Sequence, residues 1–375
     1  MNLRNSGRGK ALLLVPLVLA LGACATDAPL DTLDPKGPEA DAIQNLVVPV
    51  FAIAAVVFVL VEFGVLFLAI KFRQRKDDDD SLPVQHHGNF KLEIGWTILP
   101  ALVLAGVGAA SVFTLFDLAD TPADAQDVTV IGQQWWWEYR YDVDGDGEDD
   151  IITANDLVIP VGQPIALTIE SRDVIHSFWI PALNGKRDAV PGRAQPLTIE
   201  ADEPGVYRGQ CSEFCGLSHA YMRMRVVALE PADYQTWQEN QLTDAQVPEE
   251  ELAKQGLEQF RTSCSACHLV SGPGGNADLY KGAAQVSGAA PNLTHLASRG
   301  VFAGSIFDLW LDTNFNEEVD TEEIGKIFNV ADMKKWLRNA PAEKPMYPQG
   351  ERGMPNLQLD DAQIDALIAY LKTLE

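Results

Sequence analysis

Two long apolar stretches constrain the fold of this chain more than any other feature of its sequence. One runs from Leu46 to Ile70 and the other from Ile94 to Leu118, and each is longer than the roughly 20 residues that an α-helix needs to span a bilayer. The loop between them is basic, with Lys71, Arg73, Arg75 and Lys76. Because loops rich in Lys and Arg stay in the cytoplasm, we expect residues 46–118 to form a transmembrane hairpin with both chain ends on the extracytoplasmic side.

The first 24 residues have the layout of a signal peptide. Basic residues precede an apolar run from Ala11 to Leu21, and small residues then lead to Cys24. The segment Leu-Gly-Ala-Cys is similar to the cleavage box of bacterial lipoproteins, which predicts that Cys24 is the lipidated first residue of the mature chain. Cleavage nearby with Cys24 incidental is the alternative. Residues 25–45, rich in Pro and Asp, are expected to form a linker.

The remainder of the chain is long enough for two domains and is strongly acidic. The chain has 375 residues and a net charge of -25, and its acidic residues are concentrated after position 120. An anionic surface repels nucleic acid and attracts basic partners. We therefore expect no nucleic-acid binding and a preference for basic protein partners. The alternative is that the acidity only provides solubility.

Hydrophobic periodicity divides this remainder in two. From 120 to 232, short β-branched segments alternate with Gly and Pro, which predicts an all-β domain built as an antiparallel sandwich or barrel. The segments expected to be strands include 127–132, 156–161, 165–170 and 195–200. We expect a polar linker over 233–250 and an all-α domain over 251–375. Its last helix is predicted over Leu359–Leu374, where apolar residues recur at i, i+3, i+4 and i+7.

A run of soft metal ligands lies near the end of the β region. Cys211, Cys215, His219 and Met222 follow one another closely, and His176 lies upstream after an apolar strand. Thiolate, imidazole and thioether together favour copper over hard cations. Two such thiolates on one loop can bridge two copper ions, with one histidine for each ion and with Met222 and the backbone carbonyl of Glu213 completing the shells. A Cys211–Cys215 disulfide is the alternative, but it explains neither the histidines nor the methionine.

The helical region carries the attachment signature of a c-type haem. In Cys264-Ser-Ala-Cys267-His268, two thiols can form thioether links and the histidine can become the proximal iron ligand. A predicted helix over Glu251–Arg261 leads into this motif. Two methionines compete for the distal position: Met354, just before the last helix, is the favoured ligand, and Met346 is the alternative.

The residues around the soft ligands resemble a known family. Asp173-Val-Ile-His-Ser-Phe, Asp188-Ala-Val-Pro-Gly-Arg and Gly205-Val-Tyr-Arg-Gly-Gln-Cys follow one another as in subunit II of the haem-copper cytochrome c oxidases. The two apolar helices ahead of the β region extend the resemblance over about residues 40–230. It implies a cupredoxin-like Greek-key domain that holds a dinuclear copper centre.

The resemblance also implies roles for three further residues. Trp135 matches the tryptophan at which electrons enter, whereas Trp136 and Trp137 are expected to pack a core. Glu213 matches the residue whose carboxylate binds magnesium or manganese at the subunit I interface. Glu93 matches the glutamate at the mouth of a proton-uptake pathway, with plain solvated charge as the alternative. Glu62 has no matching role, but a carboxylate inside an apolar stretch is costly unless paired, so we expect a partner for it on subunit I.

The C-terminal region resembles the class I cytochrome c domain that is fused to subunit II in caa-type oxidases. The similar segments are Pro291-Asn-Leu-Thr-His295 and Gly353-Met-Pro-Asn-Leu; His295 itself is not expected to be a ligand, and residues 301–331 are longer and more acidic than the family pattern. The resemblance implies a respiratory oxidase subunit of the bacterial cell membrane, which passes electrons from cytochrome c or a bc-type complex through its haem and two coppers. Oxygen would be reduced on a separate subunit I, coupled to proton translocation, with subunit III as a further partner.

Four other interpretations fit less well. A copper-delivery protein would need neither the haem motif nor two spanning helices, and the copper domain of nitrous oxide reductase would lack its propeller domain. Quinol oxidase subunits resemble the fold but lack the copper ligands. Asp142, Asp144 and Asp146 begin like a calcium-binding EF-hand loop, but Thr153 stands where a glutamate is required, so an acidic hairpin is expected there.

Overall fold

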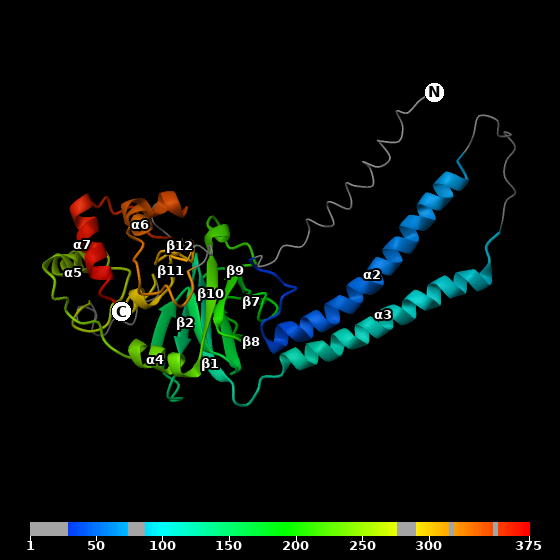
Figure 1. Cartoon of the computed structure of the whole chain (residues 1–375), viewed down its shortest axis with the longest axis horizontal. Helices are drawn as coiled ribbons and strands as arrows, with labels where there is room; N and C mark the ends of the chain where they lie inside the picture. Colours follow the sequence, from blue (N-terminus) through cyan, green and yellow to red (C-terminus); the bar gives the residue numbers. More distant parts are fainter. Residues whose placement is uncertain (1–28, 74–86, 276–289, 315–318, 348–351) are drawn as a thin grey trace, which may run out of the picture.

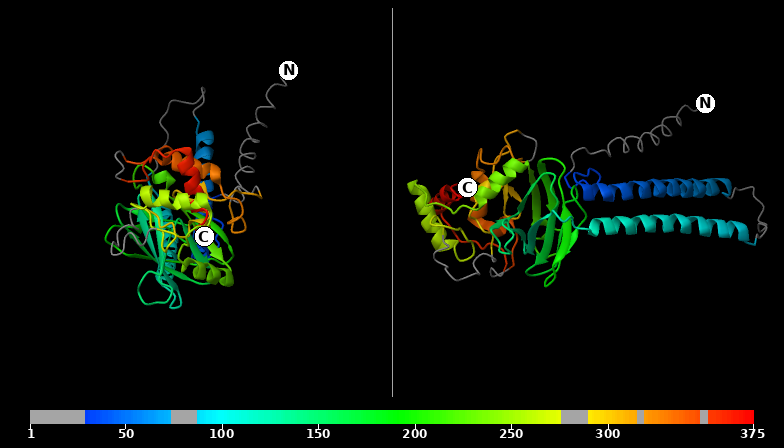
Figure 2. Two further views of the ribbon diagram at one scale, coloured as in Figure 1. Left: turned by 90° about the vertical axis from the view of Figure 1, so that its left-hand side faces the viewer. Right: turned by 90° about the horizontal axis from the view of Figure 1, so that it is seen from below.

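The computed structural model describes residues 29–73, 87–275, 290–314, 319–347 and 352–375. Two helices, α2 (Pro38–Lys71) and α3 (Phe90–Ala119), run side by side away from the rest of the molecule (Figures 1 and 2). Both are long and apolar enough to cross a membrane. The signal peptide with Cys24, and Arg75 and Lys76 of the basic loop, lie outside the described residues.

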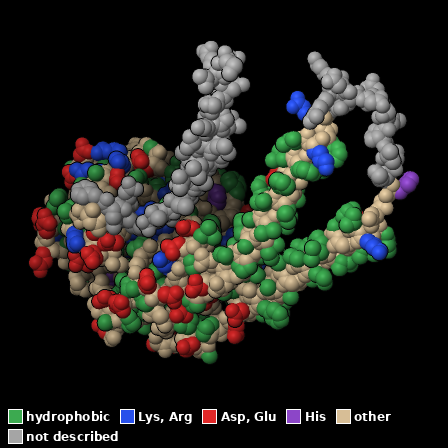
Figure 3. Space-filling model, turned by 45° about the vertical axis from the view of Figure 1, so that its right-hand side comes forward, with side chains coloured by type: hydrophobic (Ala, Val, Ile, Leu, Met, Phe, Trp, Pro, Cys, Tyr) green, Lys and Arg blue, Asp and Glu red, His purple; other side chains and the backbone are tan. Residues whose placement is uncertain are grey.

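The surface of this hairpin is apolar. Hydrophobic side chains cover both helices, whereas acidic side chains gather on the rest of the molecule (Figure 3). Among the described residues of α2 and α3, only Ala40 is buried. Helix α2 begins at Pro38 rather than Leu46, so part of the predicted linker is helical. Proline at the first helical position and Glu39 and Asp41 in the first turn favour this earlier start.

The β domain follows the hairpin and contains two main sheets. One has the strand order β3-β2-β1-β5-β8, the other has β4-β10-β9, and β6 pairs with β7. The strands are β1 (Gln126–Gln133), β2 (Trp136–Tyr141), β3 (Ile151–Ala154), β4 (Asp156–Pro160), β5 (Ile165–Ser171), β6 (His176–Phe178), β7 (Arg187–Ala189), β8 (Gln195–Ile199), β9 (Gly205–Gln210) and β10 (Arg223–Leu229).

The expectation of a purely antiparallel domain was wrong. Strand β1 pairs in parallel with β5, with Val128 opposite Leu167, and β10 pairs in parallel with β4, with Val227 opposite Val158. Parallel partners need a crossover between them, and local turn signals in the sequence do not reveal crossovers. The all-β class itself is confirmed.

Side chains from both main sheets form one buried core. Trp137, Tyr139 and Tyr141 on β2 are fully buried in it. Cys211, Cys215 and Met222 belong to the same buried cluster. The loop that carries the soft ligands is therefore anchored in the core of the domain, which restricts its movement.

The C-terminal domain is helical, as predicted. Its elements are α5 (Glu251–Ser263), β11 (Val301–Phe302), β12 (Phe307–Asp308), α6 (Val330–Glu343) and α7 (Asp361–Leu371). Helices α5 and α7 pack closely, because Gly256 leaves room for the backbone of Ala366 and the rings of Phe260 and Tyr370 lie 5.4 Å apart. Helix α4 (Pro231–Gln241) overlaps the predicted linker over 233–250, and Tyr234 and Trp237 of this helix stack on each other.

The helical domain lies against the β domain, on the side away from the membrane hairpin (Figure 2). A buried ion pair within the β domain, between Asp156 on β4 and Arg225 on β10, lies at the contact between the two domains. Asp156 accepts a 2.7 Å hydrogen bond from the Gly300 backbone N–H, and Arg225 donates a 3.0 Å bond to the Val319 carbonyl. Part of the unusually long 301–331 segment thus contacts the β domain.

Candidate metal centres

Five soft donor groups lie together at one end of the β domain. The Cys211 and Cys215 sulfurs are 3.8 Å apart. Cys211 Sγ lies 3.9 Å from His176 Nδ1, while Cys215 Sγ lies 3.6 Å from His219 Nδ1 and 3.8 Å from Met222 Sδ. The structure therefore brings together every side chain that the sequence proposed for copper.

The two cysteines are free thiols in this arrangement. A disulfide needs sulfurs about 2.05 Å apart, which their separation of 3.8 Å does not allow. The hydrogen bond between the two sulfurs, with help from His176, outweighs burial and lowers the pKa of Cys211 to about 4, whereas the same bond and burial raise the pKa of Cys215. One thiolate thus forms readily, and a bound metal cation would favour deprotonation of the second cysteine.

Asp173 orients His176. Its Oδ1 lies 2.8 Å from His176 Nε2, so that Nδ1 faces the cysteines. Burial alone would lower the pKa of His176, but the hydrogen bonds with Asp173 and Cys211 outweigh it and raise that pKa. Burial alone would raise the pKa of Asp173, but the hydrogen bonds from His176 and the Gln134 backbone N–H outweigh burial and lower that pKa. A carboxylate behind a metal-binding imidazole fixes both its ring orientation and its basicity.

The chemistry of this donor set fits copper. Thiolate, imidazole and thioether ligands select soft or borderline ions, and Cys211, Cys215, His176 and Met222 are all buried. The Glu213 carbonyl lies 3.3 Å from Cys211 Sγ, within the same cluster. Glu213 itself is an exposed residue.

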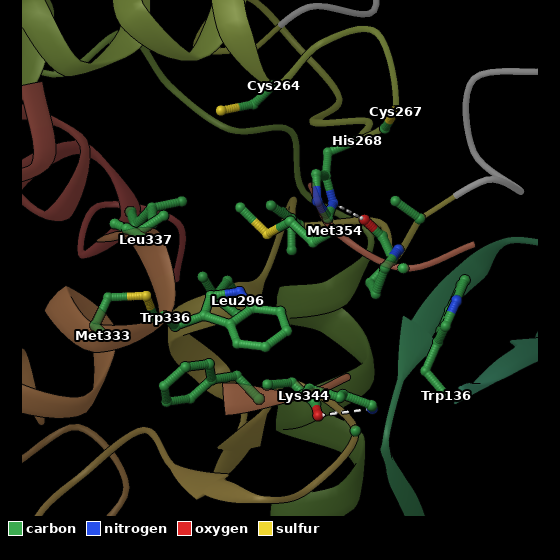
Figure 4. A pocket seen from close by; sticks show the side chains of 18 of the residues that line it. Trp136, Cys264, Cys267, His268, Leu296, Met333, Trp336, Leu337, Lys344 and Met354 are labelled. Carbon is green, nitrogen blue, oxygen red and sulfur yellow. Dashed lines mark hydrogen bonds between the residues drawn. The ribbon is translucent and has the colours of Figure 1, made fainter. Parts of the chain in front are cut away.

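The second site is a cavity in the helical domain, at its boundary with the β domain. Figure 4 shows Cys264, Cys267 and His268 at one end and Lys344 and Trp136 at the other. The walls between them are largely apolar and include Phe260, Leu296, Phe302, Trp336, Leu337 and Leu367. An apolar cavity with two thiols and an imidazole at one end fits a flat, covalently attached macrocycle such as haem.

The Cys-x-x-Cys-His motif begins where α5 ends. The backbone N–H groups of Cys267 and His268 both donate to the Cys264 carbonyl, which folds the motif into a tight turn. His268 Nδ1 lies 2.8 Å from the Pro291 carbonyl. Since a carbonyl only accepts, Nδ1 carries the proton and Nε2 carries the lone pair that an iron ion would bind. Burial lowers the pKa of His268, which favours this neutral form.

The two candidate methionines lie in different surroundings. Met354 lines the cavity and packs against the core of the helical domain. Met346 packs instead against the core of the β domain and is not among the residues that line the cavity. This placement supports Met354 as the distal ligand.

Two buried polar atoms in the cavity wall have no partner among the described residues. They are Arg299 Nε and Asn155 Oδ1. Buried polar groups are normally hydrogen-bonded, so an orphan signals a missing ligand or water. The carboxylates of a haem could pair with both groups. Arg299 would supply a positive charge. Asn155 would donate a hydrogen bond from its amide NH2 group, which takes the position of Oδ1 when the amide is flipped by 180°. Sequence reasoning missed both residues, because neither belongs to a motif.

Trp135 and Lys344 form hydrogen bonds that link the cysteine loop of the β domain to the C-terminal domain. The Trp135 indole N–H donates to the Cys215 carbonyl at 3.2 Å. Lys344 is buried, and its Nζ donates to the Trp135 carbonyl at 2.5 Å and to the Ala303 carbonyl at 2.9 Å. Burial lowers the pKa of Lys344 to about 7, although the nearby Cys215 acts in the opposite direction. The sequence contained no signal for this contact beyond a lysine before Pro345.

The remaining candidates lie apart from both centres. Glu93 is exposed in the first turn of α3, and Glu62 is exposed on α2. Both ring nitrogens of His295 lie near backbone carbonyls, those of Glu375 and Thr243, so this histidine has a structural role, as expected. Asp142, Asp144 and Asp146 gather at the β2–β3 hairpin. Of the expected core tryptophans, Trp137 is in the core, but Trp136 lines the cavity.

Fold and donor clusters together place the chain among membrane-anchored metalloproteins that pair a cupredoxin-like domain with a c-type cytochrome domain. Three family models match it: the transmembrane domain of cytochrome c oxidase subunit II over residues 26–114, the periplasmic domain of that subunit over 146–229, and cytochrome c over 313–375. The last match includes Met354 but begins after the attachment motif. The chain belongs to the cytochrome c oxidase subunit II family, in the form that has a C-terminal cytochrome c domain.

Curated relatives extend this match to nearly the whole chain. Cytochrome c oxidase subunit 2 of Alkalihalophilus pseudofirmus is 33% identical over 372 residues, covering 96% of this chain and 95% of the relative. The Bacillus subtilis protein of the same name is 31% identical and covers 97% and 96%. Quinol oxidase subunit 2 of Bacillus anthracis is 30% identical and covers 69% of this chain and 89% of its own. The crystal structure of the periplasmic domain from Bradyrhizobium japonicum covers 32% of this chain and 96% of its own, with 30% identity and a TM-score of 0.30.

Proposed function

We propose that this subunit relays single electrons from an outside donor through a covalent haem and a dinuclear copper centre to the oxygen-reducing site of subunit I. When bound, the haem and the copper pair supply reversible one-electron chemistry. The residues of the chain hold these groups, exclude water from them and fix the path between them. The observation that carries the proposal is that the five soft donors cluster in the β domain, while the Cys-x-x-Cys-His cavity lies at the boundary of that domain with the helical domain.

The copper ligands would be His176, Cys211, Cys215, His219 and Met222, with the Glu213 carbonyl. Their loop is anchored in the buried core, and Asp173 fixes the ring of His176. A rigid ligand set suits electron transfer, because little geometry then changes on reduction. Copper binding by these residues also distinguishes a cytochrome c oxidase subunit from the quinol oxidase relatives.

The haem would be linked to Cys264 and Cys267 and bound by His268 and Met354. Histidine and methionine ligation in an apolar cavity favours a high reduction potential. Arg299 and Asn155 would pair with the haem carboxylates, since both have an unpartnered buried atom in the cavity wall. Asn155 belongs to the β domain, so both domains would contribute to the haem site.

The partners follow from the proposed role. Subunits I and III would surround α2 and α3, whose apolar surfaces are uncovered, with Glu62 facing a partner in subunit I. The exposed Glu213 carboxylate would bind magnesium or manganese at the same interface, and Glu93 would stand at the mouth of a proton pathway. A basic donor, either cytochrome c or a bc-type complex, suits the net charge of -25. The location would be the bacterial cell membrane, with proton translocation coupled to oxygen reduction in subunit I.

Metal analysis of the purified complex tests this function. After the metals of subunit I are subtracted, we expect two copper ions and one iron for each copy of this chain. A chain with one copper or none would not be the proposed relay. A copper-delivery role would instead give a single exchangeable copper and no iron.

A further inference from the structure

The residue assigned to electron uptake is covered by the chain's own cytochrome domain. Trp135 has only 2% of its surface exposed. The ring of Tyr347 lies against it, with ring centroids 5.2 Å apart. An outside donor therefore meets the cytochrome domain before it can reach Trp135.

Four consecutive residues, 344–347, make this contact, and we refer to them as the strap. They follow α6 and lie across the β domain. Lys344 donates to the Trp135 carbonyl, and the Ser218 hydroxyl donates to the Pro345 carbonyl. Met346 and Tyr347 pack against the buried cluster of the β domain. Each residue of the strap thus contacts the domain that holds the copper ligands.

Two glycines make room for the strap. A β-carbon at Gly216, between two copper ligands, would lie 2.5 Å from the Tyr347 hydroxyl. A β-carbon at Gly304 would lie 2.1 Å from Lys344 Nζ and 2.8 Å from the Trp135 carbonyl. Both glycines also have positive φ angles, +114° and +77°, which favour glycine for backbone reasons. The ligand loop and the cytochrome domain are therefore shaped to fit each other at this contact.

In the proposed relay, copper receives electrons from the haem of the same chain. We propose that the strap enforces this route by sealing Trp135 against outside donors, with Tyr347 as the positioning residue for Trp135. The inference rests on the proposed function. Each electron would pass from the outside donor to a haem held by Cys264, Cys267 and His268, and then to copper at the Cys211–Cys215 loop, with no bond made or broken. A subunit without the strap would expose Trp135 and accept electrons at copper directly.

Hydroxyl-radical footprinting of the intact oxidase complex, read by mass spectrometry, tests the seal without any electron transfer. In the wild type we expect Trp135 to be protected. The double variant Lys344→Met/Tyr347→Ala removes both anchors, and labelling of Trp135 should rise several-fold. Tyr347→Phe, which keeps the ring, and Lys335→Met, which removes an exposed lysine of α6, should label as the wild type does. Equal labelling of Trp135 in the wild type and the double variant would overturn the seal.

Rapid mixing with reduced soluble cytochrome c supplies the second readout. In the wild type, copper reduction should lag behind reduction of the chain's haem. In the double variant, a new phase should appear in which copper is reduced in step with donor oxidation. Direct reduction of copper in the wild type would contradict the proposal. Haem and copper content equal to that of the wild type would show that the double variant has lost the strap contacts without misfolding, and Tyr347→Ala alone provides a milder variant.

A complex without two copper ions and one iron for each copy of this chain would refute the proposed relay. The footprinting result would still show whether the strap covers Trp135.

Discussion

Asp173 Oδ1 lies 2.8 Å from His176 Nε2, and this contact turns Nδ1 of the histidine toward the Cys211 sulfur. The carboxylate fixes the orientation of the ring. The proposed copper centre would therefore depend on a residue that is not itself one of the proposed ligands.

Asp173→Asn should weaken copper binding about 10- to 100-fold, the usual effect of losing the group behind a metal-binding histidine. The amide can still accept a hydrogen bond, but it cannot raise the basicity of the imidazole. Competition with a copper chelator measures the change. Asp202→Asn, which alters an exposed carboxylate of the same domain, serves as the control. Equal copper retention in the two variants would show that Asp173 does not support copper binding.

Met222→Leu should change the reduction potential of copper and slow electron transfer, while the domain remains folded. The swap conserves volume and should cost less than about 1.5 kcal/mol of stability. Potentiometric titration of the copper absorbance measures the first effect, and thermal unfolding measures the second. Met224→Leu is a matched control, because Met224 is equally buried two positions further along. If both variants keep the wild-type potential, Met222 is not a ligand.

Arg299→Gln should lower the midpoint potential of the haem. A buried cation near the haem disfavours the ferric form, which carries one more positive charge, so its removal stabilises the oxidised state. The shift should reach up to about 60 mV, which for one electron corresponds to a tenfold change in the equilibrium constant. Arg338→Gln, on the exposed face of α6, should leave the potential unchanged. An unaltered potential in Arg299→Gln with full haem content would show that the arginine does not act on the haem.

Docking of the two domains should strengthen as the pH rises above 7. Burial lowers the pKa of Lys344 from 10.5 to about 7, and separation of the domains would restore the higher value. Between these two values the separated state binds more protons, so the docked state gains up to about 1.4 kcal/mol for each pH unit; below pH 7 the dependence disappears. Protease susceptibility of the domain boundary from pH 6 to 9 measures the trend. Lys344→Met should remove it, and an equal slope in that variant would exclude Lys344 as its cause.

Most residues of the candidate metal sites could be predicted because they belong to short local sequence motifs. The copper ligands from Cys211 to Met222 occupy one short loop, and the haem motif occupies one turn, so their spacing alone indicated the chemistry. His176 was found because it follows a strand signal on the same domain. The apolar stretches likewise predicted both membrane helices, although the start of α2 was misplaced.

Contacts between distant segments could not be predicted in the same way. The pairing of Lys344 with Trp135 joins residues 209 positions apart, and no periodicity encodes it. The parallel strand pairs depend on the whole topology rather than on turns. Helix α4 was missed because its composition is polar, although Pro231 at its first position is a typical helix-start signal.

The order in which the two centres are reduced tests the relay most directly. The oxidised complex would be mixed rapidly with reduced cytochrome c while oxygen chemistry in subunit I is blocked, and the haem and copper absorbances would be followed separately. We expect the haem to be reduced first and copper to follow at the rate of haem reoxidation. Copper reduction that precedes haem reduction, or that persists at full rate when Met354→Ala blocks haem function, would contradict the proposed relay.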